Sequence, residues 1–139
     1  MSKPLESLIA TATSHAKEQS YESCVAVFGE IFSAYPGHPK AIRALASIML
    51  DIGQTETALS LLADAVDTDH PDPESLHQLS TLLKGQNRPG EAADLLICAV
   101  SSDPSRQNWI SELKVLLSQL GRDEEFQIYF REEDTKGDV

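Results

Sequence analysis

Apolar residues recur along the chain at intervals of three and four positions, and no stretch sustains an alternation of apolar and polar residues. The first spacing is typical of one buried face of an α-helix, whereas alternation would indicate a β-strand. The pattern therefore predicts an all-α chain with eight helices. Their expected ranges are about 4–18, 21–34, 39–52, 55–67, 73–86, 89–101, 105–120 and 123–133. The polar segment that follows them, 134–139, is expected to fray.

The apolar positions return with an offset of 34 residues, which indicates an internal repeat. Large apolar side chains share two columns of this repeat, Leu8, Ile42, Leu76 and Ile110 in one and Phe28, Leu62, Leu96 and Phe130 in the other. Small residues share two more, Ala12, Ala46 and Ser80 in one and Cys24, Ala58 and Ala92 in the other. Because small side chains let two helices approach closely, we expect the members of these two small columns to face each other within each helix pair.

The turns and helix starts follow the same period. Gln19, Gly53, Asn87 and Gly121 share one column. Gly and Asn tolerate the left-handed conformation that ends a helix, so this column predicts four helix pairs. Asp72 and Asp103 each precede a proline and are the expected N-caps of the helices that follow. The fourth repeat departs from the small columns with Lys114, Phe126 and Glu133, so its helices are expected to pack less tightly, as in a terminal capping repeat.

Together these columns resemble the tetratricopeptide repeat. The segments LASIMLDIGQTETALSLLADAV and LSTLLKGQNRPGEAADLLICAV, 34 residues apart, carry the family pattern best. The resemblance implies a solenoid, an α-α superhelix of about four helix-turn-helix repeats in a single domain, 1–139. The repeats would span about 5–38, 39–72, 73–106 and 107–133, the last being atypical or capping. It also implies a module that binds a partner peptide or protein in a concave groove.

By the same resemblance, the first helix of each pair forms the wall of the groove. The residues expected to line it are Lys40, Arg43, Ser47, His77, Gln78, Thr81, Lys84, Asn108 and Ser111. Lys40 and Arg43 share a helix face, and His77 follows Arg43 by one repeat and should lie beside it. These cations predict a small basic patch that receives a carboxylate or acidic segment of the partner; the alternative is ordinary solvated charge. The columns that hold the carboxylate clamp of some family members contain Ile9, Thr13, Ala44, Glu74 and Gln78, which disfavours that ligand class.

The chain has 22 acidic and 11 basic residues and a net charge of −11, which argues against a nucleic-acid partner. No apolar run approaches the roughly 20 residues that span a bilayer, and the N-terminus does not resemble a secretory signal. The two cysteines, Cys24 and Cys98, lie in apolar runs and are expected to be buried free thiols in a reducing cytoplasm.

No spacing of candidate ligands or nucleophiles predicts a metal site, a cofactor or an enzyme. His15 falls in a packing column and is expected to be partly buried, whereas His38 and His70 lie in separate loops and should not share a metal. Three functions remain open at this point. The chain could be an independent adaptor or chaperone-like binding module, an N-terminal regulatory or targeting domain of a longer enzyme such as a transferase, or a self-assembling scaffold that forms homo-oligomers.

Overall fold

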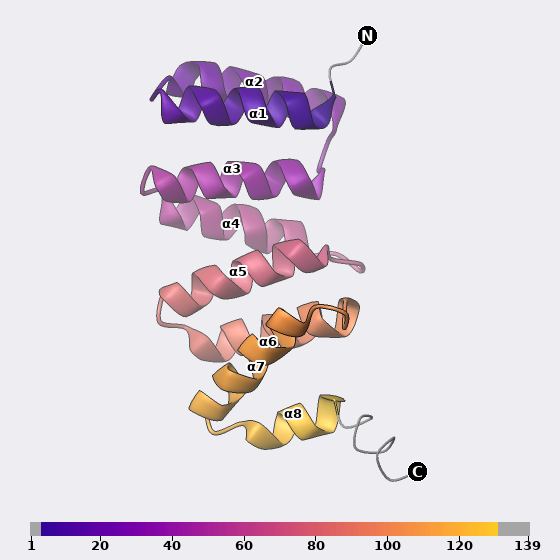
Figure 1. The fold of residues 1–139 in the computed structure, drawn as a ribbon. Coiled ribbons are helices and arrows are strands. Elements are labelled where there is room, and N and C mark those ends of the chain that lie inside the picture. The colour runs from indigo at the N-terminus through magenta and orange to yellow at the C-terminus, as the bar shows by residue number, and fades with distance from the viewer. Residues whose placement is uncertain (1–3, 131–139) are drawn as a thin grey trace. The chain divides into compact units, whose positions relative to one another are not determined.

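A computed structural model describes residues 4–130, which contain eight α-helices and no strand (Figure 1). The helices are α1 Leu5–Lys17, α2 Tyr21–Ala34, α3 Pro39–Asp51, α4 Thr55–Val66, α5 Pro73–Gly85, α6 Pro89–Ser102, α7 Gln107–Gln119 and α8 Asp123–Phe130. Each end of the first seven helices lies within two residues of its predicted position. The predicted end of the last helix, 131–133, and the polar segment 134–139 lie outside the described residues.

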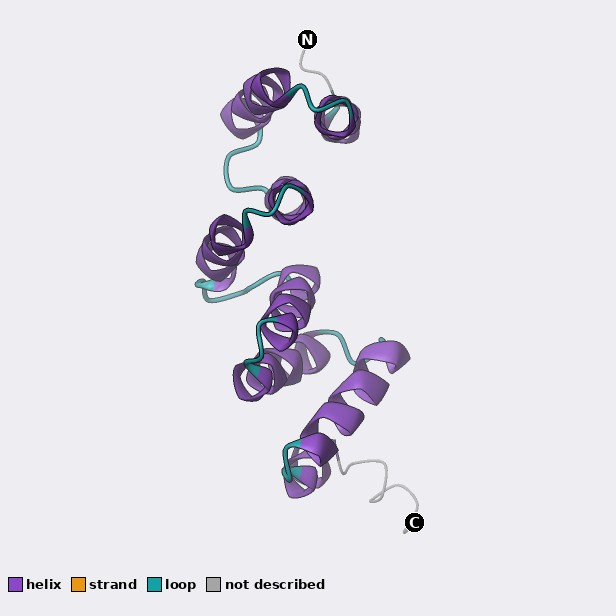
Figure 2. Cartoon of the chain, turned by 90° about the vertical axis from the view of Figure 1, so that its left-hand side faces the viewer, coloured by secondary structure: helices purple, strands orange, loops and turns teal. Residues whose placement is uncertain are grey.

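The chain divides into two compact units, Met1–Ser75 and Leu76–Val139, and the single-domain organisation stays a prediction. In the first unit, α1 packs on α2, α3 packs on α4, and α3 also contacts both helices of the first pair. Figure 2 views these four helices nearly end-on, so the two pairs can be followed along the chain. In the second unit, α7 contacts both α6 and α8.

All four turns within the pairs end the first helix in the same way. The φ angle is positive at each residue of the turn column: 61° at Gln19, 84° at Gly53, 62° at Asn87 and 71° at Gly121. The next residue then donates its backbone N–H to the carbonyl five positions earlier: Ser20 to His15 (2.8 Å), Gln54 to Met49 (2.7 Å), Arg88 to Leu83 (2.9 Å) and Arg122 to Leu117 (2.7 Å). This bonding is the Schellman motif, and it satisfies carbonyls that the helix end would leave without a partner. The predicted turn column is confirmed.

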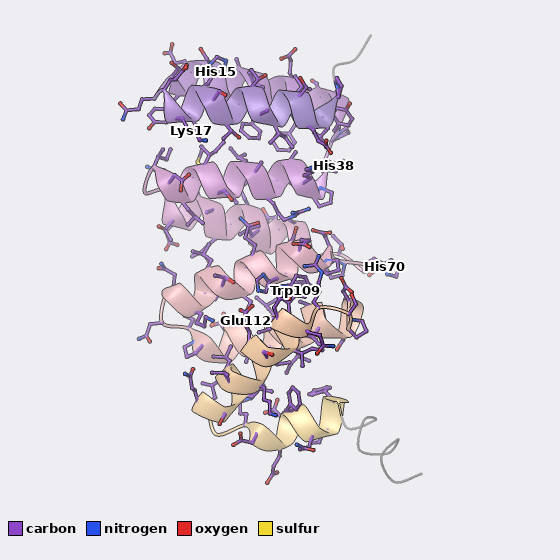
Figure 3. The ribbon with its side chains drawn as sticks, in the orientation of Figure 1. His15, Lys17, His38, His70, Trp109 and Glu112 are labelled. Atoms are coloured by element: carbon purple, nitrogen blue, oxygen red, sulfur yellow. The ribbon has the colours of Figure 1, made fainter. Side chains whose placement is uncertain are left out.

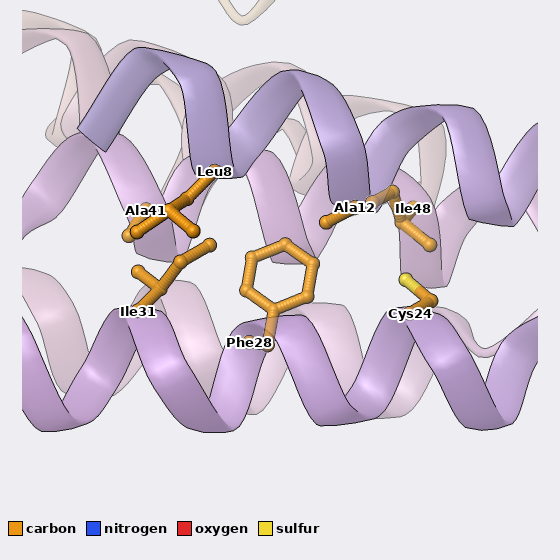
Figure 4. Close-up of a cluster of buried hydrophobic side chains, with 7 residues drawn as sticks. All are labelled: Leu8, Ala12, Cys24, Phe28, Ile31, Ala41 and Ile48. Atoms are coloured by element: carbon orange, nitrogen blue, oxygen red, sulfur yellow. The ribbon is translucent and has the colours of Figure 1, made fainter. Parts of the chain in front are cut away.

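The small-residue columns lie where the paired helices meet. In the first unit α1, α2 and α3 enclose a buried apolar cluster of Leu8, Ala12, Cys24, Phe28, Ile31, Ala41 and Ile48 (Figure 4). Ala46 and Ala58 are fully buried in α3 and α4. In the second unit, the Ser80 hydroxyl of α5 donates a hydrogen bond of 2.7 Å to the carbonyl of Ala92 on α6, so these two positions face each other as predicted.

The fourth pair replaces the small residues by a cation and an aromatic ring. The Lys114 ammonium lies 5.8 Å from the ring centroid of Phe126, so the two columns still face each other. Arg122 joins the start of α8 to α6, with Nη2 2.7 Å from Asp94 Oδ1 and Nη1 3.4 Å from the Gly90 carbonyl. Contacts around Arg122 therefore fix the last described helix where the small-residue contact is missing.

One of the two predicted N-caps is correct and the other is wrong. Asp72 Oδ2 accepts the backbone N–H of Ser75 at 3.0 Å and its hydroxyl at 2.9 Å, which caps α5. Asp103 does not cap α7, because this helix begins only at Gln107. Its carboxylate instead accepts from the Ser105 hydroxyl (2.6 Å) and from Arg106 Nε (3.2 Å), and these bonds stabilise the turn between α6 and α7.

The expectation of two buried thiols is also half wrong. Cys24 is buried in the first pair, and its burial raises the pKa of the thiol. Cys98 is exposed, because its neighbours Ile97 and Ala99 occupy the buried side of α6. Both cysteines are free. Among the described helices, none combines the length and apolar character that crossing a bilayer requires.

Candidate functional site

In the first unit, the predicted groove residues lie on α3 beside α1. Lys40, in the first turn of α3, donates from Nζ to Glu6 Oε1 on α1 at 2.9 Å. This bond lowers the pKa of the Glu6 carboxyl. Arg43 is half-buried one turn later, with Nε 3.2 Å from Asp72 Oδ2, and Ser47 is exposed one turn further on. The two cations predicted to share a face thus each have an acidic neighbour within the chain.

In the second unit, the predicted cations meet a carboxylate of α7. His77 Nε2 lies 2.9 Å from Glu112 Oε2, and Lys84 Nζ lies 4.0 Å from Glu112 Oε1. Figure 3 labels Glu112 one turn beyond Trp109 on α7. Glu112 therefore joins two positions of α5 that are seven residues apart and lie on one helix face.

The indole of Trp109 is central to this cluster, and sequence reasoning missed it. The His77 ring stacks on the indole with centroids 4.7 Å apart and planes at 15°, and the Arg106 guanidinium lies 4.3 Å from its centroid. Trp109 is only 2% exposed. Its repeat column gave no signal in the sequence, because the members one and two repeats earlier, Ser75 and Ala41, are small, although the structure buries both fully.

The other predicted groove residues are polar side chains on the same two helices. Gln78 is half-buried on α5, and the Thr81 hydroxyl donates to the His77 carbonyl at 3.1 Å. Asn108 and Ser111 are exposed on α7. The structure thus groups His77 and Lys84 around Glu112. The proximity of His77 to Arg43 stays a prediction.

The remaining histidines belong to three different segments of the first unit. His15 is half-buried, as expected, and His70 is exposed. His38 caps α3, because its Nδ1 accepts the backbone N–H of Lys40 at 3.2 Å. Within residues 4–130, no three side chains of His, Cys, Asp or Glu come together as metal ligands.

Comparisons with known proteins identify the repeat. A family model for the tetratricopeptide repeat matches residues 15–83. No curated protein matches the sequence significantly. The chain is similar to solved structures of MamA: 20% identical to the protein from Desulfovibrio magneticus RS-1, with a TM-score of 0.63 over 93% of this chain and 73% of that one.

A second MamA structure is 14% identical, with a TM-score of 0.66 over 97% of this chain and 81% of that one. A chain in the structure of Naa15/Naa10 bound to HypK-THB is 19% identical, with a TM-score of 0.70 over 97% of this chain and 21% of that one. At these identities the likeness shows the fold alone, and it confirms the predicted all-α helical-repeat architecture.

Proposed function

The chain belongs to the tetratricopeptide repeat family, and on that premise we propose that it is a protein–protein interaction module. It holds a partner peptide or protein against the first helices of its pairs and catalyses no reaction of its own. The family match carries this proposal. One of the similar solved structures, Naa15/Naa10, is itself described as bound to HypK-THB, which agrees with a protein as the partner.

The ion pairs on the first helices support a role in ligand binding. Lys40 is 46% exposed and Glu6 is 78% exposed, and Lys84 and Glu112 are 45% and 34% exposed. Exposed pairs of this kind contribute only about 0–1 kcal/mol to stability. A carboxylate from a partner can therefore replace Glu6 or Glu112 at little cost. In the free chain, Glu6 and Glu112 orient the ammonium groups of Lys40 and Lys84 for such a ligand.

We place this activity in the cytoplasm. The free thiols of Cys24 and Cys98 suit a reducing compartment, since cysteines in oxidising compartments are commonly paired. Acidic side chains outnumber basic ones by two to one, which keeps nucleic acids and anionic membranes away from the surface.

Two variants that reverse the charge of one side chain, Lys40→Glu and Arg88→Glu, test the proposal. The purified chain is immobilised and exposed to a cytoplasmic extract, and the captured proteins are identified by mass spectrometry. We expect a partner that the Lys40→Glu variant loses. Arg88→Glu is the matched control, because Arg88, which directly precedes α6, is similarly exposed, at 47%, and also pairs with a glutamate. If neither the native chain nor the control captures a protein, the interaction function is wrong.

A further inference from the structure

The lysine and arginine side chains of residues 4–130 differ in whether they contact a carboxylate or an aromatic ring. Seven of the eight lie against a carboxylate or an aromatic ring: Lys40, Arg43, Lys84, Arg88, Arg106, Lys114 and Arg122. Lys17, in the last turn of α1, is the exception within this range, since no carboxylate or ring contacts its ammonium. A cation without an internal partner remains available to a ligand.

Lys17 lies at the edge of a hollow in the first unit. The hollow has a volume of about 240 Å³ and is formed by the end of α1, the start of α2 and the last turn of α3. Its apolar lining comes from Ala16, Ile48 and Ile52, while Lys17, Tyr21 and Asp51 supply polar groups. Figure 3 labels Lys17 at this end of α1.

The size of the hollow indicates what fits it. Sites for whole small molecules measure about 300–1,000 Å³, so this hollow suits one side chain of a larger partner. The apolar surface continues from Tyr21, which lines the hollow and is 41% exposed, to Val25 on α2, which is 65% exposed. These two residues are four positions apart and so share a helix face. A peptide can therefore place one apolar side chain in the hollow and a second against α2.

We propose that this hollow anchors the partner, and that the partner segment carries an apolar side chain next to a carboxylate. The apolar side chain fills the space over Ile48 and Ile52, and the carboxylate pairs with Lys17. Asp51, on the α3 side, is a hydrogen-bond acceptor and takes a backbone N–H of the bound segment. The proposal rests on the proposed interaction function and names the feature that the module recognises.

Charge decides between an acidic and a basic partner segment. The overall charge of −11 attracts basic chains from a distance, but long-range attraction is screened beyond about 10 Å at ordinary salt. At contact, two lining side chains have no ion-pair partner among the described residues, the carboxylate of Asp51 and the ammonium of Lys17. Asp51 accepts a backbone N–H of the bound segment, so the ammonium of Lys17 is the group that requires a counter-ion. A basic ligand would leave it without one and would place two cations side by side.

Three synthetic peptides test the anchor with the full chain, labelled with ¹⁵N. They are acetylated and amidated Gly-Gly-Leu-Xaa-Gly-Gly, in which Xaa is Glu, Gln or Lys. We expect the Glu peptide to shift the amide signals of Lys17, Tyr21 and Ile52 and to bind about threefold to fivefold more tightly than the Gln peptide. In the Lys17→Gln variant, the two peptides should bind equally.

A second pair of variants tests the apolar half of the site. Ala16→Met fills the hollow and should remove the binding of all three peptides. Ala26→Met adds the same side chain at an exposed position of α2 and should leave binding unchanged. Circular dichroism checks that both variants keep the helices of the native chain.

The anchor is wrong if the Lys peptide binds most tightly, if the three peptides bind equally, or if the shifted signals lie outside the hollow. Capture from extract separates this failure from that of the proposed function. A partner that Lys17→Gln retains in full and Lys40→Glu loses would leave the interaction function standing and remove the anchor. Loss of that partner by Lys17→Gln, with retention by Arg88→Glu, supports the anchor.

Discussion

The Ser80 hydroxyl of α5 donates a hydrogen bond of 2.7 Å to the carbonyl oxygen of Ala92 on α6. The equivalent positions of the preceding pair hold two alanines, Ala46 and Ala58. Ser80 is 4% exposed, so the extra oxygen would be costly to bury without a partner. The carbonyl of the facing helix provides that partner, and the pair gains a polar link between its helices.

Substitutions at Ser80 should separate two contributions to stability, the small size of the side chain and its hydrogen bond. Ser80→Ala removes the hydrogen bond and is expected to lower the free energy of unfolding by about 0.5–1.5 kcal/mol. Ser80→Leu forces a large side chain between α5 and α6 and should cost more, about 1–3 kcal/mol or above. Urea unfolding followed by circular dichroism measures both. Equal losses for the two variants would contradict the close approach of the helices.

The turn column predicts a stabilising substitution. Gln19 adopts a φ of 61°, a left-handed conformation that costs an ordinary residue roughly 1–2 kcal/mol. Glycine adopts it freely but loses more entropy on folding, so Gln19→Gly should raise the free energy of unfolding by about 0.5–1 kcal/mol. Gly53→Ala should lower it by a similar amount, although no atom beyond the adjoining residues lies within 4 Å of the added Cβ. Thermal unfolding of both variants checks the opposite signs.

The sequence predicted the backbone well because the same local signals recur in each repeat. Gly53 and Gly121 mark turns by residue type alone, and the 34-residue offset extends that inference to Gln19, which by itself signals nothing. Pro39 and Pro73 likewise stand at the first positions of α3 and α5. A backbone N–H at this position has no partner within the helix, so its absence in proline costs no hydrogen bond.

Side-chain partnerships were beyond the same reasoning. Lys40 and Glu6 are 34 residues apart, as are Arg43 and His77, so the repeat predicts that both pairs lie on neighbouring helices in the same way. The repeat does not say which pair forms a contact, and the ion pair of Lys40 with Glu6 was found only in the structure. Ion pairing depends on how long flexible side chains are oriented, which a repeat column does not specify. The column of Trp109 was missed for a different reason. Its earlier members Ala41 and Ser75 are small, so nothing apolar and large drew attention to it.

The stacking of His77 on Trp109 provides an optical test of the second unit. Trp109 is the only tryptophan in the chain, so its fluorescence reports on this cluster alone. His77→Ala should cost about 0.5–1.5 kcal/mol of stability, as expected for loss of an aromatic pair, and should shift the emission to longer wavelength as water reaches the indole. His70→Ala is the control, because His70 is exposed and should change neither quantity.

His38 offers a test of helix capping. Its Nδ1 accepts the backbone N–H of Lys40 at 3.2 Å and so satisfies one free donor at the start of α3. His38→Ala removes this acceptor and should lower the free energy of unfolding by about 0.5–2 kcal/mol. His38→Ser restores an acceptor of a preferred type and should recover most of that loss. If the serine variant is as unstable as the alanine variant, the contribution of His38 lies in its ring contact with Tyr35 and not in the cap.

The ion pair between Arg122 and Glu125 predicts how stability depends on pH. Arg122 Nε and Nη2 lie 2.5 Å and 2.6 Å from the Glu125 carboxylate, and these hydrogen bonds lower the pKa of Glu125 in the folded chain. A carboxyl with a lowered pKa stabilises the folded state above its ordinary pKa of about 4.3, and this stabilisation is lost as the pH falls through the lower folded value.

Glu125→Gln should therefore be less stable than the native chain at pH 7, and the difference should shrink towards zero as the pH falls to about 3. Urea unfolding at pH 7, 5 and 3 measures the difference at each point. Glu124→Gln is the matched control, since Glu124 is exposed in the same turn of α8, while the side-chain hydrogen bonds of Arg122 go to Glu125, Asp94 and the Gly90 carbonyl. A difference that stays constant or grows in acid would mean that the interaction with Arg122 does not stabilise the ionised form of Glu125.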